Sequence, residues 1–131
     1  EFAPAGREAC ARLTAAGIPL LGQSVLLRGV NDDPATLEAL MRAFLAARIK
    51  PYYLHHLDAA PGTARFRVPL AQAHALLGQL RGRVSGLAQP LFVLDIPGGH
   101  GKVPIGPSYL LEDAGAVRDP GGAQHAFPDR G

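Results

Sequence analysis

Apolar residues recur at helical spacing in three segments of the chain. The segments span residues 4–16, 34–48 and 69–84, and each begins with a proline. Proline suits the first turn of a helix, because its missing N–H group would have no partner there. The apolar stripe is longest in the second and third segments: Leu37, Leu40, Met41, Phe44 and Leu45, then Leu70, Ala73, Leu76, Leu77, Leu80 and Val84. The spacing therefore predicts three amphipathic helices.

Three other segments carry the continuous apolar runs that are typical of buried strands. They lie within residues 18–30 (centred on 24–27), 51–58 and 91–94. A strand of a parallel sheet is covered on both faces, so its apolar residues need not alternate with polar ones. Since the predicted helices and strands alternate along the chain with short connections, the pattern predicts an α/β fold made of parallel βα units.

The pattern changes beyond Pro107. Short apolar segments follow, separated by Gly115 and by the run at residues 119–122. They predict a small β-rich meander or tail, so we divide the chain into βα units over residues 1–104 and an extension over residues 105–131.

Composition excludes several classes of protein. Among 131 residues, 47% are hydrophobic and 18% are charged, with a net charge of +2. This is no disordered polymer, and it lacks the basic patch of a nucleic-acid-binding protein. Cys10 is the single cysteine, which rules out an internal disulfide and a cysteine-clustered zinc site. No apolar run approaches the ~20 residues that span a bilayer, and no signal-peptide pattern opens the chain. We therefore expect a cytoplasmic protein.

The segment from Asp95 to Pro104 concentrates the candidate chemistry. It reads Asp-Ile-Pro-Gly-Gly-His-Gly-Lys-Val-Pro, and Lys102 is one of two lysines in a chain with eleven arginines. A lysine amine can form a Schiff base, which a guanidinium cannot. The glycines indicate either a tight turn or a loop that approaches a ligand closely. The segment matches neither the Walker pattern nor GxGxxG.

Two aspartates follow the apolar runs of predicted strands. Asp58 and Asp95 would meet at the carboxyl edge of a parallel sheet, where ligands gather. They could bind a cation such as an ammonium group; alternatively, they cap helices or pair with an arginine such as Arg28. A metal site of histidines is disfavoured, because His55 and His56 are adjacent on a strand and point to opposite faces.

Several motifs together resemble one enzyme family. They are Gln23–Asp32 (QSVLLRGVND), Pro51–Leu54 (PYYL) with Asp58, Ser85-Gly86, and Asp95–Lys102 with Pro104. In this order and spacing they resemble the C-terminal part of lysine 2,3-aminomutase, from about Ala5 to Tyr109.

The resemblance implies the last βα units of a partial radical S-adenosylmethionine (SAM) barrel, from an enzyme that interconverts L-lysine and β-lysine by a radical 1,2-amino migration. It implies pyridoxal phosphate, SAM and a 4Fe-4S cluster as cofactors. Lys102 matches the lysine that forms the internal aldimine with pyridoxal phosphate. Asp58 and Asp95 match the carboxylates that hold the side-chain ammonium of substrate lysine, and Gln23 matches a glutamine near the cofactors.

The chain also departs from the family pattern. The CxxxCxxC motif that binds the cluster is absent, so we expect this chain alone to be inactive. Some members carry a cysteine that binds zinc where Asp33 stands, and we expect no metal ligand and no zinc here. His55 and His100 stand where relatives often have Tyr and Gly. The implied partner is substrate lysine, without nucleic acid or membrane, and the full-length protein is expected to be a homo-oligomer.

Three alternatives remain open at this point. One is the related isomerase that prepares lysine for the modification of elongation factor P. Another is glutamate 2,3-aminomutase, although two aspartates suit an ammonium better than a carboxylate. The third is a non-catalytic α/β binding or interface module. In each case an incomplete sheet would expose an edge, so we also expect poor solubility.

Overall fold

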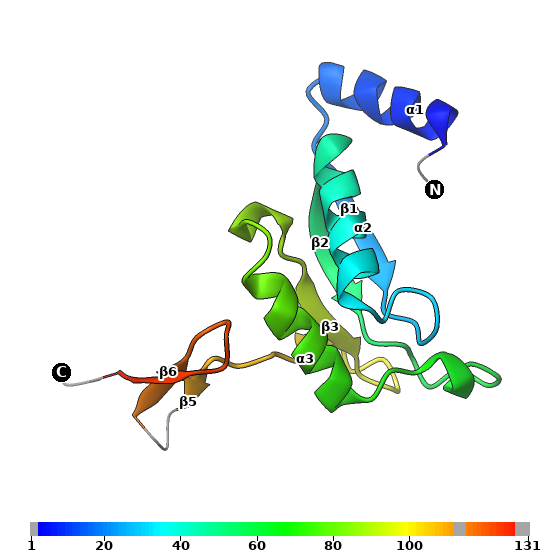
Figure 1. Ribbon diagram of the computed structural model, residues 1–131. Coiled ribbons are helices and arrows are strands. Elements are labelled where there is room, and N and C mark those ends of the chain that lie inside the picture. Colours follow the sequence, from blue (N-terminus) through cyan, green and yellow to red (C-terminus); the bar gives the residue numbers. More distant parts are fainter. Residues whose placement is uncertain (1–2, 112–114, 128–131) are drawn as a thin grey trace.

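The computed structural model describes residues 3–111 and 115–127, and it has an α/β fold (Figure 1). Three helices alternate with parallel strands, as the hydrophobic pattern predicts. The elements are α1 (Pro4–Ala15), β1 (Leu20–Val25), α2 (Pro34–Ala46), β2 (Ile49–His55), α3 (Leu70–Arg81), β3 (Leu91–Asp95), β4 (Lys102–Pro104), β5 (Leu110–Leu111), β6 (Ala116–Arg118) and β7 (Gln124–Ala126).

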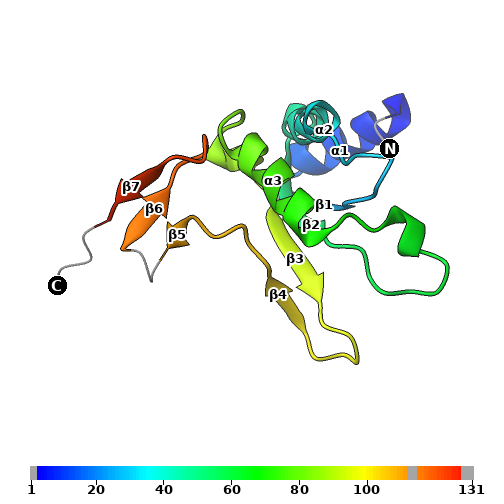
Figure 2. The ribbon, with the colours of Figure 1, turned by 60° about the horizontal axis from the view of Figure 1, so that its bottom comes forward.

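The main sheet has the strand order β1-β2-β3-β4. The β1–β2 and β2–β3 pairs are parallel, and β4 pairs with β3 in the antiparallel direction (Figure 2). The α/β class is thus confirmed, but the expectation of three strands is wrong. The residues of β4 follow the glycine run directly, and the run folds them back onto β3 as a hairpin. That the parallel strands belong to a partial barrel stays a prediction.

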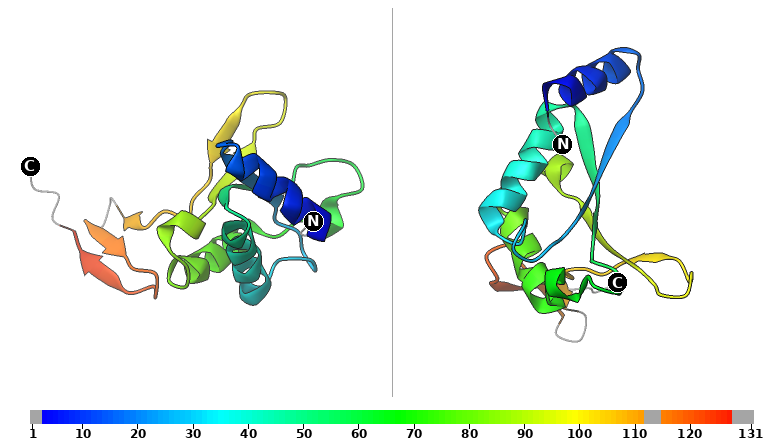
Figure 3. Two further views of the ribbon diagram at one scale, coloured as in Figure 1. Left: turned by 90° about the horizontal axis from the view of Figure 1, so that it is seen from above. Right: turned by 90° about the vertical axis from the view of Figure 1, so that its right-hand side faces the viewer.

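Helices α2 and α3 supply most of the hydrophobic core, and they lie side by side against the sheet (Figure 3). Leu54 of β2 and Phe92 of β3 are at most 1% exposed beneath them. The helix residues of this core are Leu37, Met41, Phe44, Ala73, Leu76, Leu77 and Leu80. Burial of this apolar stripe is the main force that holds the two helices on the sheet.

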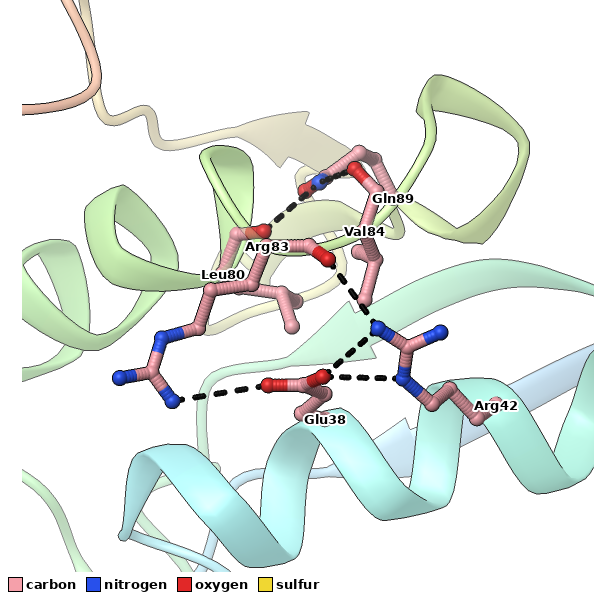
Figure 4. Close-up of polar contacts among 6 residues, drawn as sticks. All are labelled: Glu38, Arg42, Leu80, Arg83, Val84 and Gln89. Atoms are coloured by element: carbon pink, nitrogen blue, oxygen red, sulfur yellow. Dashed lines mark hydrogen bonds and ion pairs between the residues drawn. The ribbon is translucent and has the colours of Figure 1, made fainter.

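An ion-pair network also joins α2 to Arg83, which follows α3 directly (Figure 4). Glu38 accepts a hydrogen bond from Arg42 at 2.9 Å and forms an ion pair with Arg83 at 3.5 Å. Arg42 also donates to the Arg83 carbonyl at 3.1 Å, so its guanidinium bridges the two elements. These groups are mostly exposed, and such pairs contribute little to stability.

Helix α1 lies outside this core. None of its described residues is buried, and its Cys10 is half-buried. Cys10 therefore lies outside the hydrophobic core, because the helix extends past the sheet rather than packing on it (Figure 1).

Helix α2 begins with an N-cap at Asp33. The Asp33 carboxylate accepts a hydrogen bond from the Thr36 amide at 2.9 Å, and Pro34 occupies the first turn. Hydrogen bonds from Thr36, first that of its side chain and then that of its amide, lower the pKa of Asp33 from its ordinary value. An N-cap of this kind satisfies one of the free amides of the first turn.

The predicted meander forms a second sheet of three antiparallel strands, β5-β6-β7, beside α3 (Figure 2). Tyr109 leads into it, and the Arg81 guanidinium of α3 lies 5.6 Å from the centre of the tyrosine ring. Residues 112–114 and 128–131 of the expected extension lie outside the described residues. No helix within the described part of the chain has the length and apolar character needed to cross a membrane.

Candidate functional site

Four polar side chains meet where the strands of the main sheet end. Gln23 lies on β1, His55 and Asp95 are the last residues of β2 and β3, and Lys102 is the first residue of β4. Because β1, β2 and β3 are parallel, their carboxyl ends share one edge of the sheet. The antiparallel return of β4 brings Lys102 to the same edge.

Lys102 and Asp95 form the closest polar contact of this site. They are cross-strand partners in the β3–β4 ladder, and the Lys102 ammonium lies 2.6 Å from both oxygens of the Asp95 carboxylate. The hydrogen bond from Lys102 lowers the pKa of Asp95 from its ordinary value; burial opposes this shift, and His55 adds to it. Their side chains are 30% and 42% exposed, so the pair is open to solvent and to ligands. Of the two structural alternatives for Asp95, a salt bridge is therefore observed, with Lys102 and not with Arg28.

His55 contacts three of these groups through its two ring nitrogens. Its Nε2 atom lies 2.9 Å from Gln23 Oε1. Its Nδ1 atom lies 3.3 Å from the Lys102 ammonium and 3.3 Å from Asp95 Oδ2. The neighbouring His56 instead contacts the carbonyl of Val68 at 3.1 Å. The two adjacent histidines thus point apart, as the alternation of a strand predicts.

The glycine run is a hairpin turn. The Ile96 amide donates to the Gly101 carbonyl at 2.8 Å, and Gly98, Gly99 and Gly101 have φ angles of 87°, 79° and 102°. Other residues rarely adopt these angles, so the turn accounts for the glycines. The turn also borders a cavity. That the run approaches a ligand stays a prediction.

Two cavities meet at the carboxyl edge of the sheet. The first has a volume of about 730 Å³, and its lining includes Asp58, Asp95, Lys102 and Arg67. The second has a volume of about 870 Å³, and its lining includes Gln23, His55 and again Asp58. All four residues that the sequence predicts for the site therefore line one or both cavities.

Asp58 lies beyond the end of β2, in the loop that follows, and not within the strand as expected. Its carboxylate has no hydrogen-bond or ion-pair partner among the residues that the structure describes. Its backbone carbonyl accepts a hydrogen bond from the Arg67 guanidinium at 3.0 Å. Asp58 thus offers a free negative charge beside the Asp95–Lys102 pair.

Arg67 is the residue of this site that the sequence did not reveal. It is half-buried and lines the first cavity. It lies in a loop between the 3-10 helix at Ala64–Phe66 and α3, where no periodicity indicates which way a side chain points.

The described residues provide no metal-binding group at this site, and His100 lies in the hairpin turn. Within residues 3–111 and 115–127, no group of three or more His, Cys, Asp or Glu side chains could hold a metal ion. His100 follows Gly99 in the turn, and its ring lies near Gly98.

The arrangement can hold an aldehyde cofactor and a cation. A primary amine that borders a cavity can bond covalently to pyridoxal phosphate, and the volume is in the range of small-molecule sites. Arg67 is the other cationic side chain of the first cavity, and it could contact a phosphate. The residues present therefore fit pyridoxal phosphate at its point of attachment.

Comparison with known proteins gives one consistent result. A family model described as Lysine-2,3-aminomutase matches residues 77–117, which include the end of α3, β3, the hairpin and β4. The L-lysine 2,3-aminomutase of Fusobacterium nucleatum is 40% identical over 114 residues, which is 87% of this chain and 27% of that protein. The enzyme of the same name from Clostridium subterminale is also 40% identical, with the same coverage.

The comparisons also include a protein that is named for another substrate. The Glutamate 2,3-aminomutase of Clostridioides difficile is 37% identical over 111 residues, or 85% of this chain and 26% of that protein. This chain thus spans about a quarter of the length of these relatives. The resemblance inferred from the motifs is confirmed.

Proposed function

This chain is a relative of the lysine 2,3-aminomutases, and we propose that it forms the part of such an enzyme that holds pyridoxal phosphate and the ammonium group of L-lysine. The full-length enzyme would interconvert L-lysine and β-lysine, and would act as a homo-oligomer. The observation that supports this proposal best is the meeting of Lys102, Asp95 and Asp58 around one cavity.

The proposed cofactors supply the difficult chemistry. Bound pyridoxal phosphate would stabilise an unpaired electron next to the migrating nitrogen, while SAM and a 4Fe-4S cluster would generate the radical. Clusters of this kind are held by several thiolates, and this sequence has one cysteine. We therefore propose that this chain contributes substrate and cofactor contacts, and that it does not turn over lysine by itself.

Each residue has a separate task in this proposal. Lys102 provides the amine to which pyridoxal phosphate attaches. Asp95 and Asp58 bind the side-chain ammonium of substrate lysine, since a cation between two carboxylates forms charge-assisted hydrogen bonds. In this structure Asp95 already holds an ammonium group, that of Lys102. Covalent engagement of Lys102 would release Asp95 for the substrate.

The charges of the cavity favour lysine over glutamate as the substrate. Asp58 and Asp95 place two carboxylates on its wall, against the single guanidinium of Arg67 once Lys102 is engaged. A substrate γ-carboxylate would lie beside two like charges, which is unfavourable. The isomerase related to elongation factor P would share this ammonium site, so the charges do not separate it from a mutase of free lysine.

An absorbance experiment tests the attachment of the cofactor. The chain is mixed with pyridoxal phosphate, and a covalent adduct is detected by its visible absorbance. We expect the adduct in the wild type and in Lys50→Ala, and its loss in Lys102→Ala. Lys50 is the matched control because it is the second lysine and donates to the carbonyls of Pro51 and Gln89. An adduct that is independent of Lys102 would favour a non-catalytic binding module.

A binding experiment tests the recognition of the substrate. L-norleucine has the carbon chain of L-lysine without the ammonium group, so it is the matched ligand. In the presence of pyridoxal phosphate we expect L-lysine to bind about tenfold more tightly or better than norleucine, which corresponds to about 1.4 kcal/mol. Asp58→Asn should remove most of this difference in calorimetry. Equal binding of the two ligands would contradict the ammonium site.

A further inference from the structure

The imidazole of His55 is placed between the carboxylate and the amine of the site. Its Nδ1 atom is 3.3 Å from both Asp95 Oδ2 and Lys102 Nζ, and its Nε2 atom is 2.9 Å from Gln23 Oε1. Its side chain is 18% exposed, so neighbouring groups enclose it more than they enclose Asp95 or Lys102. No role follows for this histidine from the motifs that carry the family resemblance.

The contact with Gln23 determines what Nδ1 can do. When the Gln23 carboxamide oxygen accepts from Nε2–H, the neutral imidazole keeps its lone pair on Nδ1. That lone pair faces the N–H groups of the Lys102 ammonium. His55 is therefore a proton acceptor next to the amine and, once protonated, a cation next to Asp95.

Asp95 consequently has two alternative charged partners. With Lys102 protonated, the ammonium satisfies both carboxylate oxygens at 2.6 Å. When the Lys102 nitrogen loses its charge, Asp95 is left beside a neutral group. A negative charge at this distance favours the protonated form of an imidazole.

We propose that His55 is a positioning residue that takes up the proton of the Lys102 amine, and then replaces Lys102 as the charged partner of Asp95, whenever that amine is derivatised. In this step an N–H bond of Lys102 breaks and leaves its electron pair on Nζ, while a new N–H bond forms at His55 Nδ1. The free electron pair attacks the aldehyde carbon, and the aldehyde oxygen takes the two remaining protons of the amine and leaves as water. The charge near Asp95 is conserved, so the carboxylate keeps its place until a ligand ammonium displaces the imidazolium.

The groups around His55 come from each strand at this edge. Gln23 of β1 is uncharged, Asp95 of β3 is negative, and Lys102 of β4 is positive. Tyr53 of β2 lies edge-on to the imidazole, with 5.8 Å between the ring centres. The phenol of Tyr53 stays protonated at neutral pH, because its pKa is raised, chiefly by the hydrogen bond with Tyr52. Among the described residues in contact with the imidazole, Asp95 and Lys102 are therefore the ones whose charge changes.

The inference is tested by following the Hε1–Cε1 signal of each histidine by NMR in the full chain, without cofactor, as the pH is varied. In Lys102→Met we expect His55 to take up its proton about one pH unit higher than in the wild type, since a positive charge 3.3 Å away has been removed. Lys102→Gln should give the same rise, and it retains a hydrogen-bonding end in the hairpin. Adding Asp95→Asn to Lys102→Met should abolish the rise.

The other histidines provide internal controls. His56 contacts Val68, His74 contacts the Ile105 carbonyl, and His100 lies in the turn, so their titrations should be the same in all variants. An unchanged His55 titration in both Lys102 variants would overturn the inference. A rise shared by all the histidines would overturn it too, because it would report a general change in charge.

This inference rests on the proposed function in one respect, that Lys102 is the amine that becomes derivatised. The two tests fail separately. The titration contains no pyridoxal phosphate, so absence of a cofactor adduct would refute the proposed function and leave the His55 result standing. An adduct with an unchanged His55 titration would refute the His55 role alone.

Discussion

At the scale of single residues, the pairing of Asp95 with Lys102 explains the spacing of seven that separates them. The hairpin places them opposite each other across β3 and β4. The sequence alone indicated that each residue had a function, and it assigned them to different ligands. The structure adds that the two groups bind each other, so a ligand that binds either of them has to compete with this contact.

The lowered pKa of Asp95 predicts how the hairpin responds to acid. Because the folded-state pKa lies below the ordinary value of 3.8, the Asp95–Lys102 pair stabilises the fold fully above that pH, and the contribution is lost as the pH falls through the lowered pKa. We expect the Asp95 carboxyl to titrate below pH 3.8 in the wild type and closer to that value in Lys102→Met. The carboxyl carbon shift in NMR measures this directly.

Asp119 is the matched control for this titration. Its pKa is lowered by a hydrogen bond with His125, with 2.7 Å between the two groups, in the second sheet. It should titrate alike in both proteins. An unchanged Asp95 in Lys102→Met would show that the ion pair is not the cause of the shift.

Residue types and their positions predicted Lys102, Asp95 and Asp58 as site residues, and the family resemblance added Gln23; all four line the two cavities. The roles proposed for them stay predictions. The pattern did not predict Arg67, because a loop side chain has no periodic signal for its direction. It also gave His55 no partner, because that partner depends on how strands far apart in sequence align.

At the scale of elements, the sequence predicted the helices better than the strands. The helices at Pro4–Ala15, Pro34–Ala46 and Leu70–Arg81 begin within a residue of the expected starts. The strand expected at 24–27 instead covers Leu20–Val25, and β4 was not expected at all. Apolar periodicity defines a helix by itself, whereas a strand ends where its neighbour stops pairing.

The contact between β1 and α2 gives a prediction at this scale. A Cβ atom on Gly22 would lie 2.7 Å from Cε1 of Phe44, although the backbone at Gly22 would accept alanine. Gly22→Ala should therefore lower the free energy of unfolding by about 1–3 kcal/mol, the usual cost of overpacking a core. Denaturation with urea measures this change.

The steric cause can be separated from a general defect of β1. Phe44→Leu removes ring atoms that the new methyl group would meet. In the Gly22→Ala, Phe44→Leu double variant, the total loss should be smaller than the sum of the two single losses, because the sites are coupled. Additive losses would mean that Phe44 is not what excludes a side chain at position 22.

At the scale of the whole molecule, one face of the main sheet carries exposed apolar side chains. Leu21 of β1 and Leu91 of β3 are 57% and 49% exposed, while the helices cover Leu54 and Phe92 on the other face. Exposed apolar surface of this kind promotes association. The expectation of poor solubility stays a prediction, and this face is its physical basis.

Association through the sheet can be tested with one charge. Leu21→Lys places a lysine on the exposed strand β1, where a charge opposes pairing with a further strand. We expect it to reduce light scattering of concentrated solutions severalfold. Leu87→Lys is the control, since Leu87 is 63% exposed but lies in the 3-10 helix at Gly86–Ala88, outside the sheet. Equal improvement by both variants would indicate that net charge, rather than the strand, controls solubility.

The two edges of the main sheet differ in how readily they would pair with a further strand. The β4 edge is three residues long, and it presents Lys102 and Pro104, which discourage a further strand from pairing there. The β1 edge is six residues long, and Leu20–Val25 contains neither a charged residue nor a proline. Any additional strand, whether from the same polypeptide or from another, would thus pair with β1. The site at Asp95 and Lys102 would then stay beside the opposite edge of the enlarged sheet.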